Sequence, residues 1–223
     1  MSGDATRWRD LRLRVISAAV LAPTCLLCVW LGGFWFLGLV VVGLAAMGWE
    51  WCGMCGARRS LRLLGVLYIL PGGLALLWLR NDPVAGFGNV MFVLLVVWSS
   101  DIGAYLLGRL AGGPKLAPMI SPGKTWSGAL GGLLAVLLVG WGATLFGGGA
   151  APRAMAIALL LGVAAQLGDL LESAIKRGFG VKDSGWLIPG HGGVLDRVDA
   201  ILTAAPVAAL IGMTMSYGGA VWR

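Results

Sequence analysis

The chain has 223 residues, of which 58% are apolar and 12% are charged, and its mean hydropathy is +0.86. Soluble domains carry roughly 25% charged residues, so this composition excludes an ordinary soluble domain and indicates a membrane protein. The formal net charge of +7 is accounted for by anionic lipid headgroups, near which each Lys or Arg contributes about 1 kcal/mol. Because no basic stripe is interleaved with aromatic residues, we expect no nucleic acid partner.

Apolar stretches long enough to cross a membrane occur seven times, since a spanning helix needs about 20 mostly apolar residues. They cover 13–31, 34–49, 61–79, 87–107, 128–146, 153–171 and 200–220. The second is short. The first follows four arginines that could belong to a cleaved leader, but its length and the lack of a small-residue cleavage site near Pro23 favour a permanent span. Barrel-type alternation is absent, so the sequence predicts an all-α polytopic transmembrane bundle.

The distribution of Lys and Arg predicts orientation, because positive residues are retained on the cytoplasmic side. Of 17 such residues, 14 lie on one side: before or at the start of the first stretch, between the second stretch and the start of the third, or in the connections that follow the fourth and sixth stretches. The other three are Arg80, Arg153 and Arg223. This alternation fits seven spans and a cytoplasmic N-terminus. We expect scaffold helices in 1–97 and a catalytic membrane domain in 98–223, with cytoplasmic loops 108–127 and 172–199.

Carboxylates inside the apolar stretches are the first functional candidates. Asp101 in the fourth stretch and Asp169 in the sixth are predicted to lie a turn or two from the cytoplasmic helix ends. An ionised carboxylate at that depth must be paired or bind a cation. Glu172 and Lys176 follow Asp169 at helical spacing and extend a polar stripe toward the surface. For Glu172, an ordinary i,i+4 ion pair with Lys176 is an equal alternative.

The long polar connection 173–199 has the composition of a phosphate-binding loop. Its glycines let the backbone approach an oxyanion closely, and Asp196 and Asp199 place two carboxylates together at the start of the last helix. Such oxygen ligands suit Mg²⁺, which usually takes one or two carboxylates plus phosphates and water. Soft ligands are absent near His191, so we interpret it as a phosphate contact or loop organiser. The candidate phosphate-binding residues are Lys176, Arg177, Lys182, Gly190, Gly192 and Gly193.

A second connection, 108–127, is rich in Gly and Pro and contains the sequence GKT at its end. It is not a P-loop, because Pro118 stands where that motif requires Gly. A charged cytoplasmic turn is the alternative to a binding loop. Its candidate contacts to a triphosphate or a base are Lys115, Ser121, Lys124 and Thr125.

The segment 173–199 resembles the signature of CDP-diacylglycerol synthases, also called phosphatidate cytidylyltransferases. The residues at the family's spacing are Ser173, Lys176, Arg177, Lys182, Asp183, Gly185, Pro189, His191, Gly192, Gly193, Asp196, Arg197 and Asp199. DIGAYLLGR, SPGKTW and GDLLES resemble further family motifs, so the similarity covers roughly 98–215. Ser127 departs from the pattern.

This resemblance implies transfer of CMP from CTP to phosphatidic acid at the cytoplasmic face of a bacterial-type inner membrane. It also implies Mg²⁺, a monovalent cation such as K⁺ in some members, and a homodimer. We predict as catalytic residues Asp169, Asp196, Lys176, Arg177, Lys182 and Arg197. Predicted substrate contacts are Ser121, Lys124, Thr125, Ser173, Asp183, His191, Gly192, Gly193 and Asp101. Predicted metal ligands are Asp169, Asp196, Glu172 and Asp199.

Two alternatives remain from the sequence: a cation-coupled transporter and another membrane phospholipid transferase. A transporter would place its charges near the bilayer midplane, in an internally repeated sequence. Here the acids lie toward one face, and no repeat is visible. Membrane transferases that act on alcohols carry paired acids at a different spacing along one helix.

Overall fold

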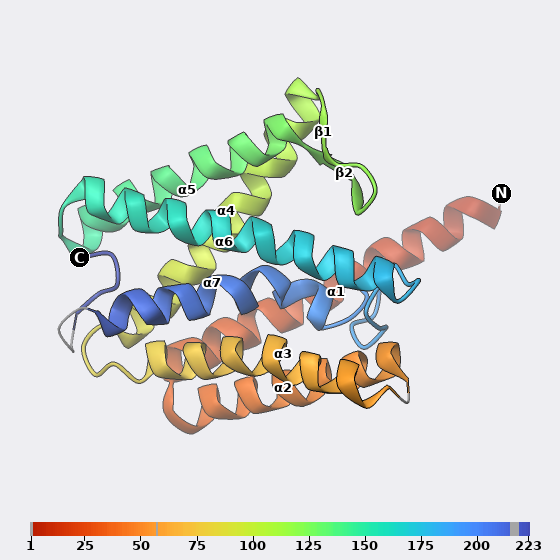
Figure 1. Ribbon diagram of the computed structural model, residues 1–223, viewed down its shortest axis with the longest axis horizontal. Helices are drawn as coiled ribbons and strands as arrows, with labels where there is room; N and C mark the ends of the chain where they lie inside the picture. Colours follow the sequence, from red (N-terminus) through yellow and green to blue (C-terminus); the bar gives the residue numbers. More distant parts are fainter. Residues whose placement is uncertain (1, 57, 215–218) are drawn as a thin grey trace.

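The computed structural model describes residues 2–56, 58–214 and 219–223. These residues form a helical bundle (Figure 1). Its helices are α1 (Ser2–Leu31), α2 (Gly33–Cys55), α3 (Arg59–Arg80), α4 (Gly86–Ala111), α5 (Trp126–Gly147), α6 (Ala151–Gly178) and α7 (Leu195–Met213). A small antiparallel hairpin of β1 (Lys115–Ala117) and β2 (Ser121–Thr125) joins α4 to α5. The prediction of an all-α bundle is confirmed, and the hairpin lies where a Gly- and Pro-rich loop was predicted.

Six of the described helices, α1 to α6, are long and apolar enough to cross a membrane. The chain is therefore a multi-pass membrane protein. The second predicted stretch, expected to be short, is a complete helix of 23 residues. Helix α7 overlaps the seventh stretch but is not one of these six, because three charged residues, Asp196, Arg197 and Asp199, occupy its first turns. Positions 215–218 of that stretch lie outside the described residues.

The hairpin, the α2–α3 connection and the α6–α7 connection all lie at one end of the bundle, which we call the loop end (Figure 1). The α1–α2, α3–α4 and α5–α6 connections lie at the other end, as the charge alternation predicts. At that second end, Arg80 donates to the carbonyl oxygens of Val29 and Trp30 (2.7 and 3.0 Å), the last turn of α1. Cations satisfy unpaired carbonyls at helix C-termini, so this arginine anchors α1 to α3.

The core lies where α4, α6 and α7 meet, and small apolar side chains fill it. Fully buried residues there include Val93, Val96, Ala158, Leu161, Ala204 and Ala208. Small residues allow close backbone approach between membrane helices. A Cβ atom at Gly168 of α6 would lie 2.0 Å from Oγ1 of Thr203 on α7. This contact fixes α7 against α6 immediately beside Asp169.

Candidate active site

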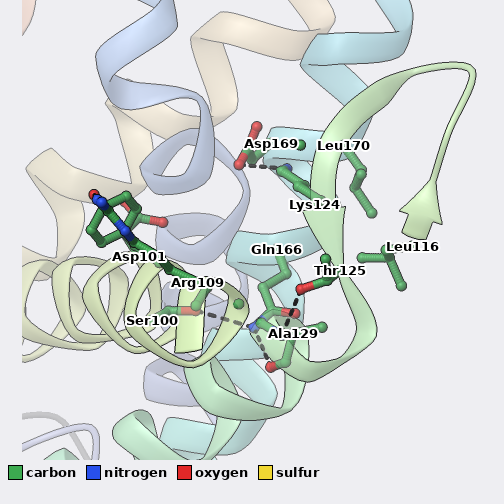
Figure 2. A pocket seen from close by; sticks show the side chains of 15 residues that line it. Ser100, Asp101, Arg109, Leu116, Lys124, Thr125, Ala129, Gln166, Asp169 and Leu170 are labelled. Carbon is green, nitrogen blue, oxygen red and sulfur yellow. Dashed lines mark hydrogen bonds and ion pairs between the residues drawn. The ribbon is translucent and has the colours of Figure 1, made fainter. Parts of the chain in front are cut away.

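A pocket of about 390 Å³ lies between α4, α5, α6 and the hairpin (Figure 2). Its polar lining residues include Ser100, Asp101, Arg109, Lys124, Thr125, Gln166 and Asp169. The Gln166 side-chain amide donates to the Ala129 carbonyl oxygen (3.0 Å) and to Ser100 Oγ (3.3 Å), which ties α6 to α5 and α4. The pocket therefore brings polar groups from three helices and the hairpin to one place near the loop end.

Lys124 of β2 and Asp169 of α6 form an ion pair of 2.5 Å across this pocket (Figure 2). Their side chains keep 28% and 33% of their surface exposed. A predicted substrate contact and a predicted catalytic carboxylate thus meet. The neighbouring Thr125 is buried, and its hydroxyl accepts a hydrogen bond from the Gly128 N–H (3.1 Å). That hydroxyl is the N-cap of α5, a structural task that the sequence did not indicate.

Asp101 and Asp169 lie deeper in their helices than predicted. Helix α4 continues to Ala111 and α6 to Gly178, ten and nine residues beyond the two carboxylates. At 3.6 residues per turn, each carboxylate is more than two turns from its helix end. The expected distance of a turn or two was too short, because both helices extend through polar residues beyond the apolar stretches.

Lys176 occupies the centre of a second cluster. Its Nζ lies 2.6 Å from Glu172 Oε2 and 2.6 Å from Asp196 Oδ1. Glu172 is only 1% exposed, and its carboxylate makes no hydrogen bond with the described residues apart from this ion pair. The i,i+4 pair considered for Glu172 is therefore present, but it is buried and shared with Asp196 rather than a solvated surface pair.

Asp196 is held from several sides. Both of its carboxylate oxygens accept from the Ser184 N–H (3.1 and 3.0 Å), and Oδ2 also accepts from the Gly193 N–H (2.9 Å). A Cβ atom at Gly192 would lie 3.0 Å from the same oxygen, and its φ is +86°. Glycine at that position allows the connection to fold tightly over the carboxylate.

Asp199 connects the two clusters. It lies within electrostatic range of Asp169, Lys176 and Asp101. Asp169 and Asp196 themselves pair with different lysines, Lys124 and Lys176. Within the described ranges, no group of three or more His, Cys, Asp or Glu side chains is arranged to hold a metal ion by itself. Any ion bound here would need ligands from substrate or water.

The remaining cations organise the loop end. Arg197 donates twice to the His191 carbonyl oxygen (3.0 and 2.7 Å), and His191 Nδ1 lies 2.9 Å from Ser17 Oγ of α1. Arg177 donates to the carbonyl oxygens of Ile120 in the hairpin (3.3 Å) and Val181 (3.0 Å). The other predicted residues of the site are half-buried or exposed near these contacts: Ser121, Ser173, Lys182 and Asp183.

Two residues of the N-terminal helices join the site although the sequence analysis assigned them no role. The Glu50 carboxylate of α2 accepts from the N–H groups of Val194 and Leu195 (both 2.9 Å). Tyr68 of α3 lies within electrostatic range of Asp199 and Glu172, and its buried hydroxyl has no hydrogen-bond partner among the described residues. Glu50 had a detectable signal, because it ends an apolar stretch as an acid, the same argument that selected Asp101. Tyr68 had none.

Comparisons with known proteins show the family of the chain. Residues 57–215 match the cytidylyltransferase family. The phosphatidate cytidylyltransferase of Brucella suis biovar 1 is 40% identical, over 91% of this chain and 93% of the relative. That of Rickettsia bellii is 37% identical, over 91% and 90%, and that of Pseudomonas aeruginosa is 40% identical, over 76% and 63%. The chain belongs to the cytidylyltransferase family.

Proposed function

We propose that the chain transfers CMP from CTP to phosphatidic acid and releases CDP-diacylglycerol and pyrophosphate. The observation that carries this proposal is the pocket at the loop end, where Lys124 faces Asp169 (2.5 Å) inside a membrane bundle. A cation in such a pocket can exchange its carboxylate partner for a phosphate. Relatives that cover most of both chains are named phosphatidate cytidylyltransferases, and membrane helices suit a lipid substrate.

The reaction we propose is an in-line displacement. A phosphate oxygen of phosphatidic acid attacks the α-phosphorus of CTP, and the bond to the pyrophosphate leaving group breaks as the new P–O bond forms. The attacking oxygen is already anionic, so no strong general base is required. The protein contributes positioning and charge neutralisation. Lys124 and Lys176 are the proposed triphosphate partners inside the site, with Arg177, Lys182 and Arg197 at its entrance.

Mg²⁺ is the proposed cofactor, and the donor set fits it. Three carboxylates pair with Lys124 and Lys176, and two more lie within electrostatic range, so the acids outnumber the nearby cations even when Arg109 and Arg197 are counted: Asp101, Asp169, Glu172, Asp196 and Asp199. Mg²⁺ usually takes only one or two carboxylates and completes its shell with phosphates and water, so a compact protein cage is not required. When bound, the ion would neutralise phosphate charge. A monovalent cation such as K⁺ could offset part of the same excess.

Among the four predicted metal ligands, Asp169 and Asp199 are best placed for that ion. Asp169 lines the pocket, and Asp199 lies within electrostatic range of it. Asp196 already accepts from Lys176 and two backbone amides, and Glu172 is buried against Lys176. We therefore propose that Asp196 and Glu172 act mainly by holding Lys176.

The location and assembly are further parts of the proposal. We infer a bacterial-type cytoplasmic membrane with the loop end facing the cytoplasm, supported by the 14 to 3 division of Lys and Arg and by the bacterial relatives. The homodimer rests on the family resemblance alone. Light scattering of the detergent-solubilised protein would test it, and a monomeric mass in active preparations would contradict it.

The decisive experiment uses detergent-purified protein, phosphatidic acid and each nucleoside triphosphate in turn. We expect pyrophosphate and CDP-diacylglycerol with CTP, only when phosphatidic acid is present, and loss of both products on chelation of Mg²⁺. Absence of lipid product from folded protein would contradict the proposal. Uptake of a cation into proteoliposomes without pyrophosphate release would favour the transporter instead.

A further inference from the structure

Glu50 of α2 lies outside the segment that matches the family, 57–215, and yet it contacts the connection before α7. It is 6% exposed. Oε1 accepts from the Val194 N–H (2.9 Å), and Oε2 accepts from the Leu195 N–H (2.9 Å) and from the Ser184 hydroxyl (3.3 Å). Val194 and Leu195 lie 144 and 145 residues along the chain from Glu50. The first scaffold helices therefore reach directly into the catalytic region.

Glu50 and Asp196 accept hydrogen bonds from neighbouring donors. Of three consecutive backbone amides, that of Gly193 donates to Asp196 and those of Val194 and Leu195 donate to Glu50. Ser184 is divided in the same way, because its N–H donates to Asp196 while its hydroxyl donates to Glu50. The two carboxylates therefore hold the same short segments, and a shift at Glu50 would move the donors that orient Asp196.

Two glycines make room for the Glu50 carboxylate. A Cβ atom at Gly185 would lie 2.8 Å from Glu50 Oε1, and one at Gly193 would lie 2.7 Å from Oε2. A side chain at either position would displace the carboxylate. The close fit is a second observation, independent of the hydrogen bonds, that the connection is built around Glu50.

The start of α7 is a favourable place for the Glu50 carboxylate. The first N–H groups of a helix have no partner within the helix, and the positive end of the helix dipole favours an anion there. Glu50 supplies that anion to α7 from another helix. Asp196, in the first turn of the same helix, then directs its carboxylate to Lys176 at 2.6 Å.

We propose that Glu50 is a positioning residue, which fixes the start of α7 so that Asp196 holds Lys176 in place for substrate phosphate. The proposal rests on the proposed function for its catalytic consequence, since Lys176 matters only if a phosphate substrate binds. The structural part of the proposal, that Glu50 fixes residues 184–196, does not depend on the proposed function.

The test compares Glu50→Gln with a matched control, Asn89→Leu. Asn89 is also buried, and its side-chain oxygen accepts a distant backbone N–H, that of Val221 (2.8 Å), at the other end of the bundle. We expect Glu50→Gln to lower kcat per folded enzyme by about 10- to 100-fold, because small misplacements of catalytic groups have effects of that order, with KM for CTP changed less. We expect Asn89→Leu to lower thermal stability but to leave kcat per folded enzyme unchanged.

Hydrogen exchange gives a readout that does not depend on activity. Peptides covering 184–196 should exchange faster in Glu50→Gln than in the wild type, and unchanged in Asn89→Leu. Equal kcat in Glu50→Gln and wild type, or equal loss in both variants, would overturn the positioning role. If Glu50→Gln fails to fold, Ser184→Ala is the second variant, because it removes only one donor to Glu50. Unchanged exchange and unchanged kcat in Ser184→Ala would overturn the positioning role. A wild type that forms no lipid product contradicts the proposed function instead, and unchanged exchange contradicts the structural part.

Discussion

Lys124 and Asp169 come from segments 45 residues apart and meet as an ion pair of 2.5 Å between Nζ and Oδ2. Each side chain is about one-third exposed toward the pocket. Partly exposed ion pairs contribute little to stability. The pair is therefore better suited to exchange partners on substrate binding than to hold the fold together.

The first prediction concerns this pair. Asp169→Asn should lower kcat by at least about 100-fold, in the range seen when one charge-stabilising group is removed from an active site. Lys124→Met should raise KM for CTP about 10-fold, as expected for loss of a charge-assisted hydrogen bond of ~1.5 kcal/mol. Steady-state kinetics with purified protein would measure both. Asp82→Asn is the control: it removes a carboxylate charge at the opposite end of the bundle, and the Asn side-chain oxygen can still accept from the Val84 and Ala85 N–H groups as Asp82 does (2.9 and 2.7 Å). Near-normal turnover in Asp169→Asn at saturating Mg²⁺ would contradict the assignment.

The second prediction concerns Lys176, which lies between Glu172 and Asp196. Lys176→Met should destabilise the protein by about 3–5 kcal/mol, because it leaves a buried carboxylate without its partner. Thermal unfolding followed by tryptophan fluorescence would measure the loss. Glu172→Gln combined with Lys176→Met should recover part of the stability and none of the activity. If Lys176→Met alone were as stable as the wild type, Lys176, Glu172 and Asp196 would not form a buried charge network.

The third prediction concerns the contact between α6 and α7. Gly168→Ala should lower stability by roughly 1–3 kcal/mol, the usual effect of overpacking, because the added methyl group meets Thr203 at 2.0 Å. It should also lower kcat, since Asp169 is the next residue. In the control, Gly142→Ala, the methyl group meets no atom within 4 Å. Ala favours helix over Gly by up to ~1 kcal/mol, so this control should be neutral or slightly stabilising. Equal melting temperatures in the two variants would contradict the packing argument.

The fourth prediction concerns the Tyr68 hydroxyl. Tyr68→Phe should leave the melting temperature of the substrate-free protein unchanged or higher, because removing a buried hydroxyl without a partner breaks no hydrogen bond. Thr125→Val is the contrasting variant. It removes a hydroxyl that caps α5 and should cost about 1 kcal/mol. A larger loss of stability in Tyr68→Phe than in Thr125→Val would show that the Tyr68 hydroxyl has a partner.

The sequence predicts the helices well because lipid requires long apolar segments, and each predicted stretch overlaps one helix. It underestimates their ends, since α4 and α6 continue through polar residues that hydropathy assigns to loops. The hairpin escaped prediction because its strands of 3 and 5 residues are too short to show alternation among Gly and Pro.

The candidate site could be predicted as a set of residues but not as a set of contacts. Membrane depth and glycine content select Asp169, Asp196 and Lys176 from the sequence alone. They do not indicate that Asp169 pairs with Lys124 rather than Lys176, because that choice depends on how the hairpin folds over α6. They mark Glu50 as an acid at the end of an apolar stretch, but they do not reveal its partners, which lie 144 and 145 residues away.

The position of Glu50 before residue 57 has a consequence for the boundaries of the family segment, 57–215. A fragment cut to that segment would retain both lysines and all of the paired acids, but the amides of Val194 and Leu195 would lose their acceptor. Each buried donor left unsatisfied costs about 1–3 kcal/mol. The segment that matches the family, 57–215, is thus shorter than the part of the chain needed to hold the start of α7 in place.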